Sequence, residues 1–170
     1  MRSRFLPEGR LLHTPENEAA CASRDGLRRA MEEGTVLEGV AQLCDGAHNL
    51  LVSVGPFTGF LPREEAALGI AEGTTREIAI LSRVGKPVCF QITALEESEG
   101  VLRPRLSRRR AQQAALDAML AGLHPGCILP AVVTHLESFG AFVDIGCGVP
   151  SLIGIESISV SPSPPPARRS

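Results

Sequence analysis

The sequence predicts a mainly β protein with helical connections, in which two small five-stranded barrels follow one another along the chain. Three observations support this prediction. Short runs in which apolar and polar residues alternate are bounded by glycine, as is typical of half-buried strands. A similar strand pattern occurs twice, once from residue 34 and once from residue 126. After the second pattern comes SPSPPPARRS, a Pro/Ser-rich stretch that favours disorder, so the second barrel is expected to be truncated.

Residues 1–33 are predicted to form a helical lead to the first barrel. Thr14 followed by Pro15 is typical of an N-cap and the first position of a helix. The apolar stripe that follows is weak and is interrupted at Asp25-Gly26, so the segment forms either one broken helix or two short ones. The glycine at the end of the segment is expected to end the helix.

Residues 34–106 are predicted to form the first barrel. Strand-like runs, separated by turns and by one short acidic helix, follow one another in this part of the chain. The runs are Val36–Asp45, Asn49–Pro62, Arg76–Leu81, Val88–Glu97 and VLRPRL at 101–106, whose proline favours an edge strand. Five or six short strands with one small helix are typical of the oligonucleotide-binding (OB) type of barrel.

Residues 107–123 are predicted to form a helix that connects the two barrels. Ser107 is an acceptable N-cap, the following residues are rich in alanine, and a His-Pro-Gly turn ends the helix. Residues 126–160 are predicted to be the partial second barrel, with strands at Cys127–Glu137, Gly140–Gly146 and Ser151–Val160. Residues 161–170 are predicted to be a disordered Pro/Ser/Arg tail.

An internal repeat relates the two barrels. LVSVG at residues 51–55 matches FVDIG at residues 142–146 position for position. Counting back from this match, His48 stands at the place of Phe139, and Leu51 at the place of Phe142. The first copy therefore keeps the core positions but lacks the aromatic pair, so that only the second copy is equipped for stacking.

Phe139 and Phe142 are the candidate ligand-binding rings. A strand here sends Val143 and Ile145 into a core and puts Phe142 beside a carboxylate on the opposite face. Exposed aromatic rings on a small barrel suit the stacking of unpaired bases, which is worth roughly 1–3 kcal/mol per base. The alternative is that both rings pack against a neighbouring element, and the spacing alone leaves both readings open.

The charge distribution limits how the chain can bind a nucleic acid. Residues 1–100 hold ten Lys/Arg and fifteen Asp/Glu, whereas residues 101–170 hold seven and four. A protein that binds mainly by phosphate neutralisation would be more basic, so we expect local contacts from stacking and from one basic cluster. The alternative for this cluster is a solvated helix start with no ligand. The cluster consists of Arg103, Arg105, Arg108, Arg109 and Arg110.

Other classes of protein find little support in the sequence. The chain has no apolar stretch near 18 residues and no signal-peptide segment at its start, so we expect a cytoplasmic protein without a membrane partner. The five cysteines form no C-x-x-C pair and no histidine lies at zinc-finger spacing, so neither a metal site nor a disulfide framework is indicated. Phosphate-loop, dinucleotide and nucleophile motifs are missing. We therefore expect no enzyme, no cofactor and no small-molecule substrate.

A family resemblance supports the nucleic-acid interpretation. The run G-x-I-x-P-A-V-V-T-x-x-x-x-F-G-A-F-V-D-I-G, from residue 126 to residue 146, resembles the opening of the S1 RNA-binding domain. This domain is the repeated five-stranded barrel of bacterial ribosomal protein S1, and it also occurs in exoribonucleases and initiation factors. SLIGIESIS resembles its third strand, and GPFTGFLPREE and LSRRRAQ in the first copy resemble a more divergent S1 domain. The resemblance covers roughly residues 34–160.

The resemblance implies that single-stranded RNA, either mRNA or rRNA, binds across the barrel face in translation or RNA turnover, with the ribosome as a candidate partner. Phe139 and Phe142 match the stacking positions of the family, whereas the third-strand histidine is replaced by Gly154. His48 and Phe57 lie near the corresponding surface of the first copy, and Phe57 is predicted to be the exposed ring there. The alternative function is an OB-type protein-docking module that associates with the ribosome without its own RNA readout.

An S1-type barrel needs two more strands after SISV, and the sequence offers none. Three explanations are open: the chain is shortened, its last residues are read out of frame, or the missing strands come from another molecule. The first two are favoured jointly. The arginine-rich and lysine-poor composition is typical of a GC-rich genome, in which out-of-frame Pro/Ser/Arg runs arise easily, and it supports the second explanation.

Overall fold

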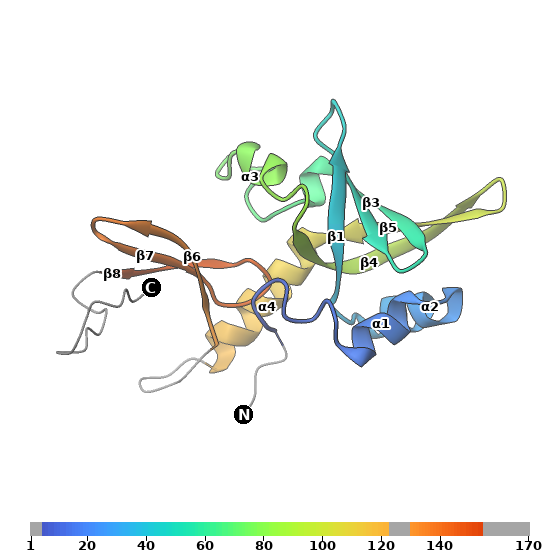
Figure 1. Cartoon of the computed structure of the whole chain (residues 1–170), viewed down its shortest axis with the longest axis horizontal. Coiled ribbons are helices and arrows are strands. Elements are labelled where there is room, and N and C mark those ends of the chain that lie inside the picture. The colour runs from blue at the N-terminus through green and yellow to red at the C-terminus, as the bar shows by residue number, and fades with distance from the viewer. Residues whose placement is uncertain (1–4, 123–129, 155–170) are drawn as a thin grey trace.

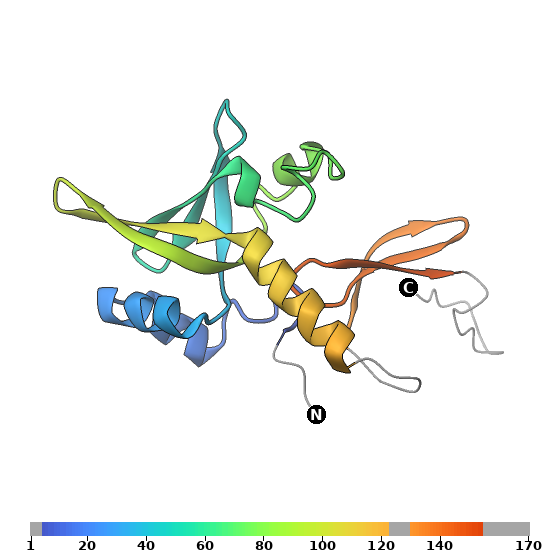
Figure 2. The same ribbon diagram turned by 180° about the vertical axis from the view of Figure 1, so that it is seen from behind.

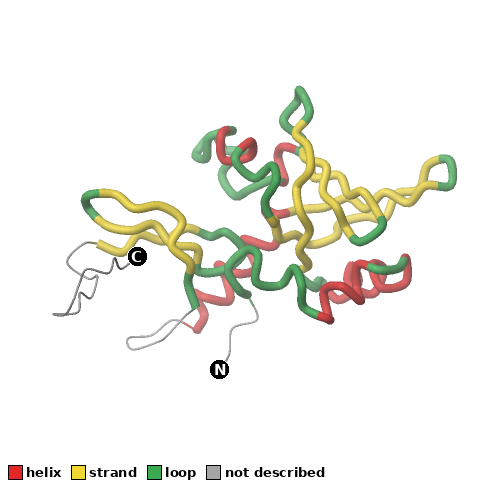
Figure 3. Tube along the Cα trace, in the orientation of Figure 1, coloured by secondary structure: helices red, strands yellow, loops and turns green. Residues whose placement is uncertain are grey.

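The structure, a computed structural model, describes residues 5–122 and 130–154. It consists of a closed five-stranded barrel and a separate three-stranded sheet, with the helix α4 (Arg108–Gly122) between them (Figures 1 and 2). Among the residues that the structure describes, strands and loops predominate over helices (Figure 3). The prediction of a mainly β protein with helical connections is confirmed. In the described residues, no helix is both long and apolar enough to cross a membrane.

The helical lead consists of two short helices, α1 (Pro15–Cys21) and α2 (Arg24–Glu33). The Thr14 side chain accepts a hydrogen bond from the first turn of α1, with proline at the start of the helix as predicted. Ser23 caps α2 in the same way. Gly34 ends α2 with φ of +68°, a left-handed conformation that a glycine adopts without strain.

The barrel closes in the order β1-β2-β3-β5-β4, with β4 returning to β1. Neighbouring strands are antiparallel except β3 and β5, which meet in parallel at Phe60 and Arg105. A five-stranded barrel of this kind is consistent with the OB type predicted for the first copy. Its strands are β1 (Leu37–Cys44), β2 (Leu50–Val54), β3 (Phe57–Leu61), β4 (Pro87–Ser98) and β5 (Val101–Ser107).

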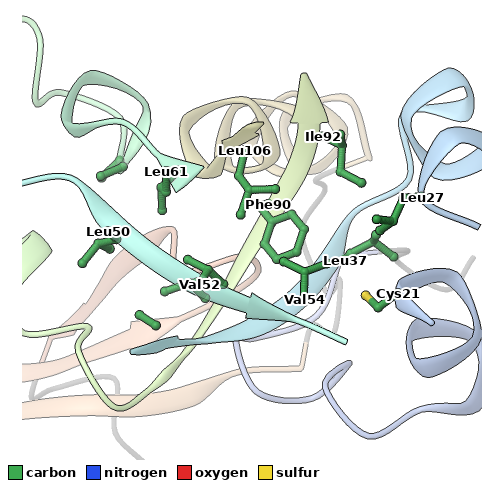
Figure 4. Close-up of a cluster of buried hydrophobic side chains, with 14 of the residues drawn as sticks. Cys21, Leu27, Leu37, Leu50, Val52, Val54, Leu61, Phe90, Ile92 and Leu106 are labelled. Atoms are coloured by element: carbon green, nitrogen blue, oxygen red, sulfur yellow. The ribbon is translucent and has the colours of Figure 1, made fainter. Parts of the chain in front are cut away.

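Alternate residues of these strands fill the barrel interior around Phe90, and side chains of α1 and α2 close one end (Figure 4). A fully buried Leu, Val or Phe contributes roughly 1.5–3 kcal/mol to stability. Gly59 belongs to this packing, because a Cβ there would lie 2.7 Å from Leu106 Cδ1. The labelled core residues are Cys21, Leu27, Leu37, Leu50, Val52, Val54, Leu61, Phe90, Ile92 and Leu106.

Between β3 and β4 the chain forms η1 (Arg63–Glu65) and α3 (Ile78–Leu81). The prediction of a strand at Arg76–Leu81 is therefore wrong. The barrel is closed, with β1 paired to β2 on one side and to β4 on the other, so β1 has no free edge with which a further strand could pair. Apolar alternation also misleads here, because Ile80 is buried at 1% exposure whereas Ile78 is 63% exposed.

The three-stranded sheet is antiparallel in the order β6-β7-β8. Its strands are β6 (Val132–Glu137), β7 (Gly140–Asp144) and β8 (Pro150–Gly154). In residues 130–154 the structure thus shows three strands and no second closed barrel. The predicted end of the last strand at Val160 and the predicted tail at 161–170 lie outside the described residues.

A small apolar cluster joins the sheet to the barrel. Its buried members come from the N-terminal segment, β4, α4 and the loop between β7 and β8. The helix α4 lies between the two β units, and the Ser107 side chain caps it by accepting from the backbone N–H of Arg110 at 3.0 Å. The cluster consists of Phe5, Cys89, Ala111, Ala115, Cys147 and Val149.

Candidate nucleic-acid interface

Two phenylalanine rings lie on one face of the three-stranded sheet. Alternation along β7 sends Ala141 and Val143 to the opposite face, where each is 3% exposed. Phe142 is half-buried in the middle of β7, and Phe139, in the turn before it, is 52% exposed. Their ring centroids are 6.1 Å apart with an interplanar angle of 88°, an edge-to-face contact that holds the two rings in a fixed relation.

A third ring, missed in the sequence, lies beside them. His135 on β6 is directly opposite Phe142 on β7, with ring centroids 6.2 Å apart and planes tilted by 31°. Sequence reasoning placed the family histidine at Gly154 on the third strand and counted a ring as missing. The hairpin register was the available signal, because a turn at Ser138-Phe139 pairs residue 135 with residue 142. We call Phe139, Phe142 and His135 the aromatic triad.

The aromatic triad extends into an exposed apolar surface across the sheet. Leu152 on β8 pairs with Phe142 on the side away from His135, and its side chain is exposed. His135, Phe142 and Leu152 therefore form one row over three strands. A row of rings and an aliphatic side chain, open to solvent, can accept the flat face of an unpaired base.

Asp144, predicted to lie on the ring face, turns away from it. Its carboxylate accepts hydrogen bonds from the backbone N–H groups of Glu8 at 2.8 Å and of Gly146 and Gly148 at 2.9 Å. These bonds shape the loop between β7 and β8 and attach the sheet to the N-terminal segment.

Arg108, predicted to contact RNA, is buried, and that prediction is wrong. Its guanidinium donates to both carboxylate oxygens of Glu8 at 2.7 Å and to the carbonyl oxygen of Ala66 at 3.1 Å. Only 7% of its side chain is exposed. The sequence could not show this, since the partner lies 100 residues away. A phosphate cannot reach Arg108 without breaking a buried ion pair.

The other predicted arginines divide into paired and exposed ones. Arg109 donates to Glu65 at 3.2 Å and 3.3 Å, so a carboxylate already neutralises it. Arg105 lies 3.9 Å from Glu96, and its guanidinium carbon is 5.3 Å from the centroid of the Phe60 ring. Arg103 on β5 is exposed. Of the predicted cluster, Arg103, Arg105 and the exposed Arg110 of α4 remain available to a phosphate.

On the first barrel the outward ring is Phe60 and not Phe57. Gly59 and Leu61 face the barrel interior, so Phe60 between them faces out. Phe57 lies two residues before Gly59 on β3, so its side chain points inward as well, and it packs against the core. This corrects the prediction that Phe57 is the exposed ring. Phe60 pairs with Leu51 on β2 and lies under Arg105 on β5, which gives this barrel a small apolar and cationic surface of its own.

His48 lies in the turn between β1 and β2 and contacts a carboxylate from a distant segment. Its Nδ1 is 2.6 Å from Glu77 Oε2, and Arg63 Nε donates to the other oxygen of the same carboxylate. The hydrogen bond from Arg63 lowers the pKa of Glu77, burial opposes this slightly, and His48 lowers it further. Within the described residues no group of three His, Cys, Asp or Glu side chains could hold a metal ion.

Comparison with known proteins finds structural likeness alone. No family model and no curated protein matches the chain. The solution structure of GSP13 from Bacillus subtilis is similar at 20% identity and a TM-score of 0.34, over 57% of this chain and 64% of that chain. The crystal structure of the a/eIF2alpha–aDim2p–rRNA complex from Pyrococcus horikoshii OT3 is similar at 17% identity and a TM-score of 0.38, over 52% and 50%. The chain thus spans less than two thirds of either match.

Proposed function

We propose that this chain binds single-stranded RNA, mRNA or rRNA, by stacking unpaired bases on the aromatic triad. The observation that carries the proposal is the placement of Phe139, Phe142 and His135 on one exposed sheet face, with centroids about 6 Å apart. Each stacked base contributes roughly 1–3 kcal/mol. Because stacking uses the faces of the bases and not their hydrogen-bonding edges, the sequence preference of the RNA site is expected to be low.

Three further observations support this function. Arg103 and Arg105 provide cations on the barrel surface, in a chain whose net charge is −2. The second copy resembles an S1 domain in its sequence. The two rings that match the stacking positions of that family, Phe139 and Phe142, are in contact on the sheet. In this proposal the chain is a non-catalytic, cytoplasmic RNA-binding protein of translation or RNA turnover, in which residues 34–106 and 126–160 correspond to S1-type domains.

The test is a fluorescence-anisotropy titration of a labelled unstructured RNA at about 50 mM and about 200 mM salt. It compares the intact chain with the double variant Phe139→Ala/Phe142→Ala after circular dichroism has shown matching folds. Leu120→Ala is the matched control, because it truncates an exposed apolar side chain on α4 away from the rings. We expect the double variant to lose about tenfold or more in affinity and the control to lose nothing.

The other outcomes separate the competing functions. Equal affinity of the intact chain and the double variant would overturn the stacking proposal and leave the barrel surface as the RNA site. No RNA binding by either chain would favour the alternative of a protein-docking module, to be examined with purified ribosomes. Competition with duplex RNA completes the test, since a stacking site requires bases that are unpaired.

A further inference from the structure

The short helix α3 and the turn after it carry an exposed apolar ridge. Ile78, Leu81 and Val84 recur every three residues, and their exposed fractions are 63%, 41% and 39%. Ile80 is buried in the barrel core, so α3 is anchored by one side and turns the other side to solvent. Exposed apolar side chains that lie together, and are not scattered singly, are typical of an interaction site. We call Ile78, Leu81 and Val84 the α3 ridge.

The charge beside the α3 ridge is positive. Arg76 precedes the ridge and Lys86 follows it, and both side chains are exposed. Among the described residues, neither forms an ion pair with a carboxylate. Glu77, which follows Arg76 in the sequence, is already bound to His48 and Arg63. The ridge thus presents apolar side chains between two cations that the described part of the chain does not neutralise.

A cavity of about 370 Å³ lies between the N-terminal segment, α1 and the turn that joins α2 to β1. Phe5, Leu11, Val36 and Leu37 contribute apolar side chains to its lining. An apolar cavity of about 150 Å³ already holds a molecule of the size of benzene. The larger cavity therefore admits the side chain of an isoleucine or a leucine.

Two carboxylates belong to the same cavity. Glu16 of α1 and Glu33, the last residue of α2, both line it, and both side chains are exposed. Neither forms an ion pair with another residue that the structure describes. The cavity is thus the complement of the α3 ridge, because it combines an apolar lining with carboxylates where the ridge combines apolar side chains with cations. Complementary charge of this kind selects a partner and its orientation.

The ridge and the cavity of one chain lie at opposite ends of its barrel. Figures 1 and 2 show α3 above the barrel and α1 and α2 below it, in both views. A chain therefore cannot place its own ridge in its own cavity. The ridge of one copy remains free to meet the cavity of another.

We propose that the chain associates with itself head to tail: the α3 ridge of one copy enters the cavity beside α1 of the next, with the cations of the ridge next to the carboxylates of the cavity. The two patches differ, so the interface is heterologous and builds rings or open chains of copies and not a two-fold dimer. Because the apolar part of the ridge is only three side chains, we expect weak association, with a Kd on the order of 100 µM.

The first experiment measures the average mass of the intact chain by sedimentation equilibrium, from about 10 µM to about 1 mM protein, which brackets the expected Kd. The mass is expected to rise above the monomer value with concentration. Ile78→Ser is the variant and Leu120→Ser is the matched control, because both side chains are apolar and 63% exposed, on α3 and α4. We expect Ile78→Ser to weaken association by about tenfold or more, and the control to leave it unchanged.

A charge exchange tests whether these two surfaces meet. Arg76→Glu/Lys86→Glu makes the ridge acidic, and Glu16→Lys/Glu33→Lys makes the cavity basic. All four side chains are exposed, so the folds are expected to hold, which circular dichroism checks. Each double variant alone brings like charges together and is expected to stay monomeric. An equal mixture of the two brings opposite charges together again and is expected to associate.

The outcomes decide the proposal without reference to RNA, which the samples do not contain. A monomer at every concentration overturns self-association and leaves the cavity to a basic and apolar segment of a different protein. Association that Ile78→Ser does not weaken overturns the α3 ridge as the interface. A mixture of the charge variants that is no heavier than its separate components overturns the pairing of the ridge with the cavity.

Discussion

Glu8 and Arg108 form a buried ion pair across 100 residues of sequence, with two hydrogen bonds of 2.7 Å. The same carboxylate accepts from the backbone N–H of Cys89 at 2.9 Å, and Arg83 lies 3.3 Å from it. Burial raises the pKa of Glu8, but the charges and hydrogen bonds of these neighbours, Arg108 first, hold it below its usual value. One carboxylate thus ties the N-terminal segment, β4 and α4 together.

The first prediction concerns this ion pair. Arg108→Leu leaves the carboxylate of Glu8 buried with Arg83 as its remaining cation, so we expect a loss of about 3 kcal/mol in the free energy of unfolding. Arg109→Leu is the matched control. Arg109 follows Arg108 in α4 and forms a part-exposed ion pair with Glu65 of η1, which is worth about 1 kcal/mol or less. Urea denaturation measures both. Equal losses for the two variants would contradict the structural role of Arg108.

A second prediction follows from Glu38, whose side chain is buried on β1. Burial raises its pKa from the usual 4.5 to about 7, although the backbone N–H of Gly9 donates to it. In the unfolded chain the group ionises at lower pH, so between about pH 4.5 and about pH 7 the unfolded state has released a proton that the folded state retains. Stability contributed by this group therefore falls as the pH rises through that interval, by on the order of 3 kcal/mol.

Glu38→Gln isolates the contribution, because the amide keeps the shape of the side chain and does not titrate. Urea unfolding of both chains at about pH 5 and about pH 8 gives the comparison. We expect the stability of the intact chain relative to the variant to be lower at the higher pH. Glu8, with its lowered pKa, acts in the opposite direction but equally in both chains, so it cancels in the difference. If the free energies of unfolding of the two chains differ by the same amount at both pH values, the raised pKa of Glu38 is contradicted.

Phe57 and Phe60 offer a third prediction, since they lie on the same strand with opposite orientations. Phe57 packs against the barrel core, so Phe57→Ala is expected to lower the free energy of unfolding by roughly 2–3 kcal/mol. Phe60 faces out under Arg105, so Phe60→Ala loses a cation–π contact worth about 1 kcal/mol or less. Urea denaturation of the two variants checks the order. A greater loss for Phe60→Ala would place the outward ring in the core.

The same pair shows how far the sequence could predict the structure. The alternating runs around Leu51 and Phe142 correctly placed the strands, because period-two burial follows from local geometry. The orientation of Phe57 depended on whether Gly59 left room for a ligand or for Leu106, and the sequence could not distinguish these. Long-range pairing was likewise hidden: the burial of Arg108 depends on the distant Glu8. Local pattern therefore predicted the strands of the barrel, and tertiary contacts determined which side chains are exposed.

The last prediction tests whether His135 acts in RNA binding as a ring or as a charge. Both roles fit its place beside Phe142. His135→Ala removes the ring and is expected to weaken binding of an unstructured RNA by roughly threefold to tenfold, since one stacking surface is lost. His135→Phe keeps a flat ring without any proton, so stacking predicts affinity near that of the intact chain at about pH 8, where most imidazoles are neutral. If His135→Phe binds as weakly as His135→Ala, the imidazole acts through its nitrogen atoms, because the aromatic surface alone would then contribute nothing to the affinity.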